Sequence, residues 1–249
     1  MKKERMWIVG HRGAMGHAPE NTRASFEKAL RLGADAVECD VHRSKDGETV
    51  VLHDGRLDRT TNGRGPVRSR TWAQLRKLDA GAWFAPRFKK ERLWRLGDLI
   101  RWARRKKTRA GRPLNLIVEI KTSPDSPRRL PAAVVEALAA GGMVDRTIVI
   151  SFDPRAVRAV KARCPALRAG LLFSNPLPGL TRRMAALGAD AIFPKHTLID
   201  RALMTTARRH GWFVGTWTAN ETAELRRLSS LGVHAAATNY PERAPRPRS

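Results

Sequence analysis

The chain contains 249 residues, of which 48 are Lys or Arg and 23 are Asp or Glu, so its formal net charge is +25. This length suits a single α/β domain of barrel type, which commonly has about 250 residues. No run reaches the roughly 18 apolar residues of a membrane-spanning helix, and the start MKKERMW lacks the apolar core of a signal peptide. We therefore expect a cytoplasmic protein. Cys39 and Cys164 have no spacing that suggests a metal or redox site.

Apolar, strand-like runs alternate with helix-length segments along the chain. The runs are WIVGHRG (7–13), AVECDV (36–41), LNLIVEIK (114–121), TIVISF (147–152), RAGLLF (168–173), DAIFP (190–194), WFVGTWT (212–218) and AAATN (235–239). Alternating strands and helices predict a parallel sheet, and eight such units in about 250 residues predict a (β/α)8 TIM barrel. A doubly wound sheet is the alternative, but its typical G-x-G-x-x-G turn is missing.

A hairpin is predicted directly after the second run. Asp46-Gly47 is a strong turn signal between two strand-like segments. In a simple register about this turn, His53 lies opposite Asp40, although a slip of one residue would reverse every face. Glu38 and Asp40 share one face of their strand because strand side chains alternate. We therefore expect Glu38, Asp40 and His53 to cluster.

Charged and polar side chains come late in several of the predicted strands. The carboxyl ends of barrel strands gather on one rim, where catalytic residues lie. The residues concerned are His11, Arg12, Glu38, Asp40, Glu119 and Lys121. Three carboxylates together suit a hard divalent cation, arginine suits phosphate, and histidines suit acid–base work near neutral pH. Taken alone, each residue is better explained by a structural role, such as an ion pair or, for His53, a turn. Strands are depleted in Asp, Glu and Lys, however, so the whole set favours a functional site.

The densest positive charge lies at 86–112, in PRFKKERLWRLGDLIRWARRKKTRAGR. Within it Leu96, Leu99, Ile100 and Ala103 follow helical spacing, and the opposite face is basic. Such a helix can lie on an anionic membrane, but an apolar stripe that faces the protein core is the usual arrangement. We predict a surface helix that packs its apolar side inward, and keep peripheral membrane contact as the alternative.

An ordered set of short motifs runs along the chain. It begins with His11-Arg12-Gly13, Pro19-Glu20-Asn21-Thr22, Glu38-x-Asp40-Val41 and His53-Asp54, the last followed by LDRTTNG. It continues with LDAGAWF from Leu78, VEIK from Val118, SFDP from Ser151, WTAN from Trp217 and TNYP from Thr238. This set resembles the glycerophosphodiester phosphodiesterases over residues 8–243, nearly the whole chain; the HRG triplet alone would be a weak sign.

The resemblance implies one domain over residues 1–249, a (β/α)8 barrel with a small insertion at about 54–95. It implies hydrolysis of small-molecule glycerophosphodiesters to an alcohol and sn-glycerol 3-phosphate. The family is thought to use the glycerol 2-hydroxyl as nucleophile, giving a cyclic phosphate that water then opens. The implied roles are one divalent cation, Ca²⁺ or Mg²⁺, on Glu38, Asp40 and Glu119; acid–base catalysis by His11 and His53, with the division of roles left open; phosphate contacts from Arg12 and Lys121; and packing of Trp217 by the glycerol end.

Two further residues of the first loop are expected to support this site. Asn21 is a suitable cap for the helix that follows, and Glu20 is placed to orient Arg12 or His11. The chain also departs from the family pattern. Asn239 replaces the usual Asp, His234 stands where an acid is common, and Trp94-Arg95 replaces the usual Pro-Thr. None of these positions belongs to the implied metal ligands or histidines, so the departures bear on substrate choice and loop geometry.

Two other functions compete with this interpretation. A lysophospholipase D-type enzyme on the same barrel would act on lysophospholipids at a membrane, which the basic stretch 86–112 favours. A non-catalytic barrel that binds polyanions or nucleic acid would explain the net charge of +25. Such a binding module has no need of three carboxylates beside a phosphate site, so we do not expect a nucleic-acid partner.

Overall fold

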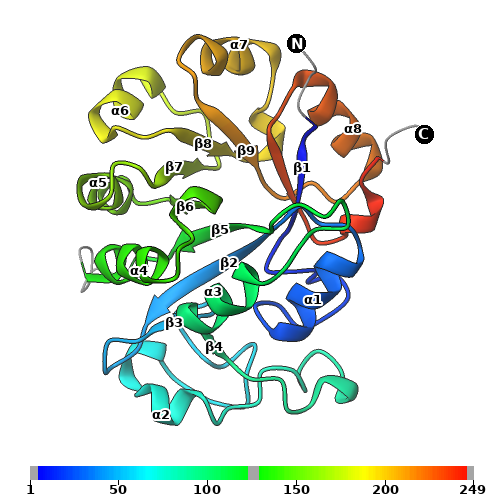
Figure 1. The fold of residues 1–249 in the computed structure, drawn as a ribbon, viewed down its shortest axis with the longest axis vertical. Helices are drawn as coiled ribbons and strands as arrows, with labels where there is room; N and C mark the ends of the chain where they lie inside the picture. The colour runs from blue at the N-terminus through cyan, green and yellow to red at the C-terminus, as the bar shows by residue number, and fades with distance from the viewer. Residues whose placement is uncertain (1–4, 123–128, 246–249) are drawn as a thin grey trace.

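The computed structural model describes residues 5–122 and 129–245. Eight parallel strands close into a ring, because the first strand pairs with both the second and the last of them. In ring order they are β1 (Trp7–Gly10), β2 (Ala36–Arg43), β5 (Asn115–Ile120), β6 (Thr147–Ser151), β7 (Arg168–Phe173), β8 (Ala191–Pro194), β9 (Phe213–Thr216) and β10 (Ala235–Thr238). Figure 1 shows these strands in the middle of the molecule and helices around them. The predicted TIM barrel is confirmed, and each predicted run contains or overlaps one ring strand.

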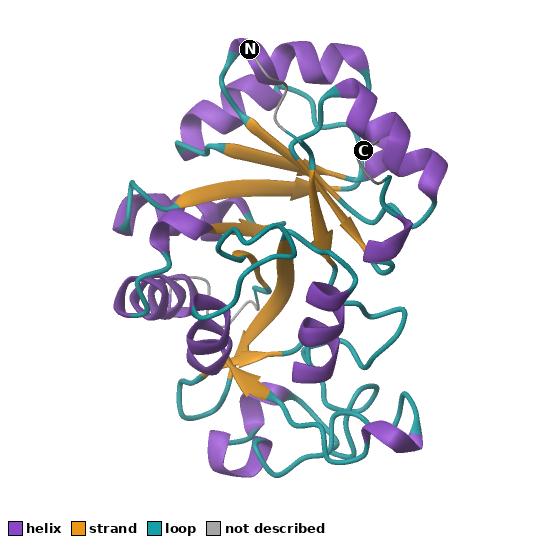
Figure 2. Ribbon diagram, turned by 45° about the vertical axis from the view of Figure 1, so that its right-hand side comes forward, coloured by secondary structure: helices purple, strands orange, loops and turns teal. Residues whose placement is uncertain are grey.

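Helices connect the ring strands on the outside of the barrel (Figure 2). They are α1 (Arg23–Arg31), α3 (Leu96–Arg104), α4 (Arg129–Ala140), α5 (Pro154–Arg163), α6 (Leu180–Leu187), α7 (Arg201–Arg209) and α8 (Thr222–Leu231). Short 3-10 helices lie in the connections: η3 (Val144–Arg146), η4 (His196–Leu198) and η5 (Pro241–Arg243). Side-chain caps begin α5 and α7, where Asp153 accepts from Arg155 N and Asp200 accepts from Leu203 N. Because of this cap, only two residues separate the end of β6 from the start of α5.

Strand alternation divides the barrel into an outer and an inner layer. In β2 and β5 the outward side chains, among them Val37, Cys39 and Val118, belong to the apolar layer between the strands and the helices. The inward set begins with Ala36 and Ile117, which belong to the core inside the barrel. Because side chains alternate along a strand, the same register turns the carboxylates of the next inward positions toward the barrel axis.

The predicted hairpin is present, but its register differs from the prediction by one residue. Gly47 takes the turn with a φ of +93°, a conformation that glycine adopts at little cost. β3 (Thr49–Val51) pairs antiparallel with β2, with Val41 opposite Val51. Leu52 N therefore donates to Asp40 O, and Asp40 faces Leu52 rather than His53. The turn motif defines where the chain reverses, but it leaves the pairing open by one residue.

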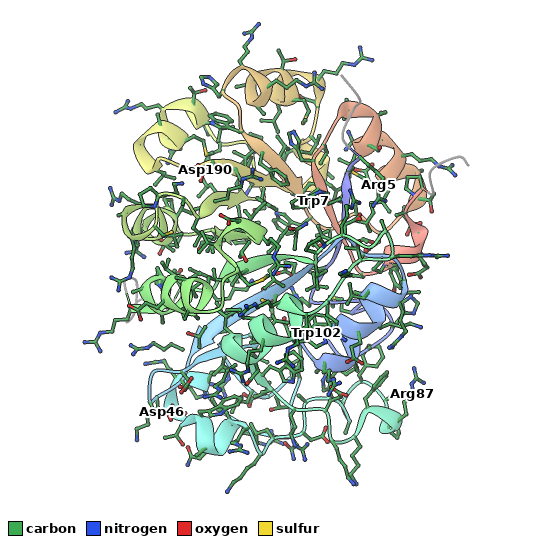
Figure 3. All side chains as sticks on the ribbon, in the orientation of Figure 1. Arg5, Trp7, Asp46, Arg87, Trp102 and Asp190 are labelled. Carbon is green, nitrogen blue, oxygen red and sulfur yellow. The ribbon has the colours of Figure 1, made fainter. Side chains whose placement is uncertain are left out.

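The insertion, residues 54–95, forms a small lobe beyond β3. It contains η1 (Val67–Ser69), α2 (Trp72–Leu75), η2 (Pro86–Phe88) and β4 (Trp94–Arg95), which pairs with β3. Its own apolar cluster includes Leu57, Leu75 and Leu93. Asp46 of the hairpin turn accepts a hydrogen bond from Trp72 N at 3.0 Å and lies beside α2 in Figure 3. The lobe is thus attached to the barrel through the hairpin.

The basic stretch forms the predicted surface helix. In α3 the buried residues are Leu96, Leu99, Ile100 and Ala103, the four that the spacing selects. The ring of Trp102, which is labelled on this helix in Figure 3, lies 5.9 Å from that of Phe26 in α1 by its centroid. None of the helices within 5–122 and 129–245 combines the length and the apolar character that crossing a bilayer requires.

Candidate functional site

The loop after β1 starts the site with an unusual backbone. Arg12 and Gly13 both have positive φ, +49° and +85°. A Cβ on Gly13 would lie 2.4 Å from Ser25 Oγ, so the close approach of α1 requires glycine here. The chain is held across the barrel closure, since His11 N donates to Thr238 O at 3.0 Å. The HRG segment is therefore fixed between the first and last ring strands.

Three buried carboxylates meet on the inward face of β2 and β5. Asp40 pairs directly with Glu119 in the parallel register. Oxygens of Glu38, Asp40 and Glu119 all lie within 4.8 Å of one another. The three carboxylates supply oxygen atoms alone, and all three side chains are buried. A convergent set of buried oxygen ligands fits a hard divalent cation such as Mg²⁺ or Ca²⁺.

Burial and mutual repulsion raise the pKa of two of the three carboxylates. Burial, followed by the charges of Asp40 and Glu119, raises the pKa of Glu38 well above its usual range. Burial and then Asp40 raise the pKa of Glu119 to about 7. Burial alone would raise the pKa of Asp40 too, but the nearby Lys121 and Arg12 hold it below its usual range. A bound cation would stabilise all three in the charged form.

Two cations flank the carboxylates. Lys121 Nζ lies 3.0 Å from Asp40 Oδ1 and 2.6 Å from Glu119 Oε1. Arg12 Nε lies 3.3 Å from Asp40 Oδ2, and the backbone N–H of Arg12 donates to Glu38 Oε2 at 2.8 Å. Both cationic side chains are mostly buried, with exposed fractions of 14% for Arg12 and 17% for Lys121. The site therefore joins positive and negative groups at one place.

The Glu20-Asn21-Thr22 segment supports the site, but one predicted role was wrong. Glu20 Oε1 accepts from Arg12 Nη1 at 3.0 Å, so Glu20 orients Arg12. The cap of α1 is Thr22, whose side chain accepts from Ser25 N, and not Asn21. Asn21 has a positive φ of +59° and donates through Nδ2 to Asp40 Oδ2 at 2.9 Å. Its left-handed backbone turns the amide toward the carboxylates instead of the helix.

Each of the two histidines named from the sequence has a partner on Nδ1. His11 Nδ1 lies 2.8 Å from Asn239 Oδ1. An amide oxygen only accepts hydrogen bonds, so with this partner the neutral ring of His11 has its proton on Nδ1 and its lone pair on Nε2. Burial, followed by the charge of Arg12, lowers the pKa of His11 to about 4. His11 is therefore a neutral imidazole near pH 7.

His53 has a charged partner. His53 Nδ1 lies 2.7 Å from Asp54 Oδ1. Asp54 is held in turn by Arg59, whose Nε donates to Asp54 Oδ2 at 2.7 Å. This hydrogen bond from Arg59 is the main reason that the pKa of Asp54 lies below its usual range. A carboxylate oxygen only accepts hydrogen bonds, so Nδ1 of His53 is the donor to Asp54 and Nε2 is left for other partners.

A cavity of about 80 Å³ opens between these groups. Its polar wall contains His11, Arg12, Glu38, His53, Glu119 and Lys121. Its apolar wall continues into the barrel and includes Val9, Ile117, Ile150, Leu172 and Phe193. Trp217 lies at the same wall; its Nε1 donates to Phe193 O at 2.9 Å, and its ring packs edge-on against Phe152 at 5.4 Å.

The structure thus places the site residues named from the sequence close together. Asp40 faces Leu52 in the hairpin rather than His53, and Asn239 and Arg59 are additional residues of the site. His53 reaches the cavity from the segment after β3 although the predicted pairing was one residue off. Asn239 was noted only as a departure, and its contact with His11 was missed. Arg59 was missed as well, although it lies in the quoted LDRTTNG motif, five residues after Asp54. No sequence period marks either contact, because both depend on how loops fold.

Comparison with known proteins agrees with this geometry. The profile of the glycerophosphoryl diester phosphodiesterase family matches residues 11–243. The glycerophosphodiester phosphodiesterase of Caldanaerobacter subterraneus is 32% identical over 235 residues, which cover 94% of each chain. That of Bacillus subtilis is 31% identical over 256 residues, which cover 97% of this chain and 86% of the relative.

Solved structures are also similar. A phosphodiesterase of Oleispira antarctica, in complex with the product sn-glycerol-3-phosphate, has a TM-score of 0.86 and 28% identity, covering 96% of this chain and 94% of its own. A glycerophosphodiester phosphodiesterase of Agrobacterium tumefaciens has a TM-score of 0.83 and 30% identity, and the match covers 96% of this chain and 98% of that one. With a family profile that spans almost all of the sequence, the chain belongs to the glycerophosphoryl diester phosphodiesterase family.

Proposed function

We propose that the protein hydrolyses glycerophosphodiesters to an alcohol and sn-glycerol 3-phosphate. One observation carries the proposal: His11 and His53 line the same cavity as Glu38 and Glu119 of the carboxylate cluster. Acid–base groups, anion-binding cations and cation-binding carboxylates then act on one bound molecule. A phosphodiester linked to glycerol suits all three, and an Oleispira antarctica relative binds sn-glycerol-3-phosphate.

Glu38, Asp40 and Glu119 are proposed to hold one divalent cation, Ca²⁺ or Mg²⁺. Their buried oxygens and the lack of sulfur or imidazole ligands in the cluster support a hard cation rather than zinc. When bound, such a cation would offset the negative charge of the phosphate and lower the pKa of the attacking hydroxyl.

His11 is proposed as the general base of the first step. A base must be neutral before it accepts a proton, and burial lowers the pKa of His11 to about 4. The hydrogen bond to Asn239 supports the same role, because it leaves Nε2 as the accepting atom. His11 Nε2 would take the proton of the glycerol 2-hydroxyl as that oxygen attacks phosphorus.

His53 is proposed as the general acid of the same step. Its Nδ1 lies 2.7 Å from the Asp54 carboxylate, which orients the ring and leaves Nε2 as the atom that can exchange a proton with the substrate. The protonated ring would give its Nε2 proton to the alcohol oxygen as the bond from phosphorus to that oxygen breaks. Water then opens the cyclic phosphate, with the two histidines in exchanged roles.

Arg12 and Lys121 are proposed to bind the phosphate oxygens. Both are cationic and both reach the cavity, and the fork of a guanidinium matches two phosphate oxygens. Trp217 is proposed to pack against the glycerol end, since its ring lines the apolar wall. The remaining opening would be left for the alcohol.

The proposal is tested by measuring release of sn-glycerol 3-phosphate from a panel of diesters with choline, ethanolamine, serine and glycerol head groups. Release from at least one of them at more than background rate supports the function. Absence of product from every diester, together with salt-dependent binding to duplex DNA, would favour the non-catalytic polyanion-binding barrel instead.

Lysophospholipids form a second candidate substrate class. In the described part of the chain the exposed large hydrophobic side chains are Trp83 and Phe152, at 40% and 46% exposure. Phe152 lines the cavity, and Trp83 lies 6.0 Å from the guanidinium of Arg59. An acyl chain would contact such side chains, whereas glycerophosphocholine has none. A kcat/KM for lysophosphatidylcholine above that for glycerophosphocholine would identify the enzyme as lysophospholipase D-like.

A further inference from the structure

Arg59 of the insertion makes two bidentate ion pairs with two different carboxylates. Its Nε and Nη2 donate to the oxygens of Asp54 at 2.7 Å and 3.0 Å. Its Nη1 and Nη2 donate to the two oxygens of Glu20 at 2.8 Å each. The planar guanidinium presents five donors in a fixed fork, which suits this arrangement, whereas an ammonium is a point charge. One side chain thereby ties the insertion to the loop after β1.

Each of these carboxylates contacts a group of the proposed site on its other side. Asp54 Oδ1, which accepts from Arg59, also lies 2.7 Å from His53 Nδ1. Glu20 Oε1, which accepts from Arg59, also accepts from Arg12 Nη1 at 3.0 Å. Arg59 thus lies at the centre of a continuous chain of hydrogen bonds from His53 to Arg12.

The negative charges of Glu20 and Asp54 in this hydrogen-bond network are stabilised by Arg59. The Glu20 side chain is only 1% exposed, and a buried carboxylate is unfavourable unless it is paired. Burial acts to raise the pKa of Glu20, but the hydrogen bonds from Arg59, then the charge of Arg12, hold it below its usual range. Arg59 itself is 44% exposed, so its own charge is partly screened by solvent. Its two bidentate contacts fix the positions of Asp54 and Glu20 relative to each other.

We propose that Arg59 is a positioning residue that fixes His53 and Arg12 relative to each other, through Asp54 and Glu20. This inference rests on the proposed function, in which His53 protonates the leaving alcohol and Arg12 binds the phosphate. The leaving oxygen is bonded to that phosphorus, so the two side chains must be held in one geometry. Small displacements in such a pair lower the rate of the chemical step.

The first test compares Arg59→Gln with Arg56→Gln. Arg56 is a matched control in the same lobe, exposed and paired with Asp58 rather than with a site residue. Arg59→Gln should lower kcat on glycerophosphocholine by roughly 10-fold to 100-fold, because misplacing a reacting group by about 1 Å can cost about 10²-fold. Arg56→Gln should leave kcat unchanged. Arg59→Lys keeps the charge without the fork and should also lose kcat; a wild-type kcat in Arg59→Lys would overturn the proposal.

Double-mutant cycles separate positioning from a general structural role. Asp54→Asn and Glu20→Gln each remove one partner of Arg59. Combined with Arg59→Gln, each should lose less kcat than the product of the two single losses, because the variants interrupt one chain of contacts. If the losses multiply in either pair, that partner does not transmit the effect of Arg59, and the proposal fails.

A measurement on the resting protein distinguishes failure of this inference from failure of the proposed function. The ¹⁵N signals of the His53 ring can be assigned as those lost in His53→Gln. Arg59→Gln should shift them, whereas Arg56→Gln should not. Unshifted His53 signals in Arg59→Gln would overturn the positioning role even if the wild-type enzyme is active. Shifted signals with no hydrolysis by the wild type would instead retain the contact and reject the proposed function.

Discussion

Asn239 Oδ1 lies 2.8 Å from His11 Nδ1, although 228 positions separate the two residues in the chain. The contact follows from the closure of the barrel, in which Gly10 at the end of β1 lies opposite Thr238 at the end of β10. A neutral amide in this position fixes the ring of His11 without adding a negative charge beside it. Burial, followed by the charge of Arg12, is what lowers the pKa of His11 to about 4.

Asn239→Asp should move the acid limb of the pH profile. A carboxylate beside Nδ1 stabilises the imidazolium, so the pKa of His11, which burial lowers to about 4, should rise by about one unit or more. Because the base must be neutral, kcat/KM should then begin to fall at higher pH than in the wild type. Asn175→Asp, which adds the same charge at an exposed residue, should leave the limb in place. An unmoved limb in Asn239→Asp would contradict the role of His11.

Glu119→Gln should weaken binding of the divalent cation and lower activity while the fold is retained. Glu119 contributes one of the three carboxylate ligands, and the amide that replaces it in the variant lacks the negative charge that attracts a hard cation. Calorimetric titration with Ca²⁺ and with Mg²⁺ measures the affinity. Glu136→Gln is the matched control, since Glu136 is 61% exposed on α4. Equal affinities in the two variants would show that the carboxylate cluster is not the cation site.

His53→Ala and His11→Ala should respond differently to the leaving group. Each should lose about 10²-fold to 10⁴-fold in kcat on glycerophosphocholine, the usual effect of removing a general acid or base. A glycerophosphodiester of p-nitrophenol has a leaving group that needs little protonation. His53→Ala should regain much of its rate on this substrate and His11→Ala should not. Recovery by His11→Ala instead would reverse the assignment of acid and base.

Charge reversal on α3 should affect binding to anionic surfaces and spare turnover. Arg104, Arg105 and Lys107 are exposed and do not line the cavity, whereas Lys106 lies 5.6 Å over the ring of Trp102 and is best retained. Arg104→Glu, Arg105→Glu and Lys107→Glu together should weaken sedimentation with vesicles that contain phosphatidylserine. Hydrolysis of glycerophosphocholine at moderate salt should stay within about twofold of wild type, because exposed charges beyond a Debye length are screened. A large loss of kcat would place this face in the catalytic cycle.

Much of the fold could be predicted because it depends on local periodicity. The apolar runs of the ring strands and the spacing of Leu96, Leu99 and Ile100 on α3 directly reflect which side faces the core. The hairpin register could not be predicted in the same way. A turn motif states where the chain reverses, and the exact pairing of Val41 with Val51 depends on packing against the rest of the barrel.

The site was predictable in its residue types but not in its contacts. Glu38, Asp40 and Glu119 could be grouped because strand alternation and the barrel rim bring them together. The position of Asn21 depends on a positive φ that a polar side chain near a helix start does not reveal. The contacts of Arg59 depend on the path of the insertion, which carries no regular period.

Glycerophosphocholine hydrolysis by chelated protein, before and after return of Ca²⁺ or Mg²⁺, tests the central claim most directly. The carboxylate cluster predicts that exhaustive chelation abolishes release of sn-glycerol 3-phosphate and that one of the two cations restores it. Undiminished release after chelation would contradict a metal-dependent phosphodiesterase built on Glu38, Asp40 and Glu119.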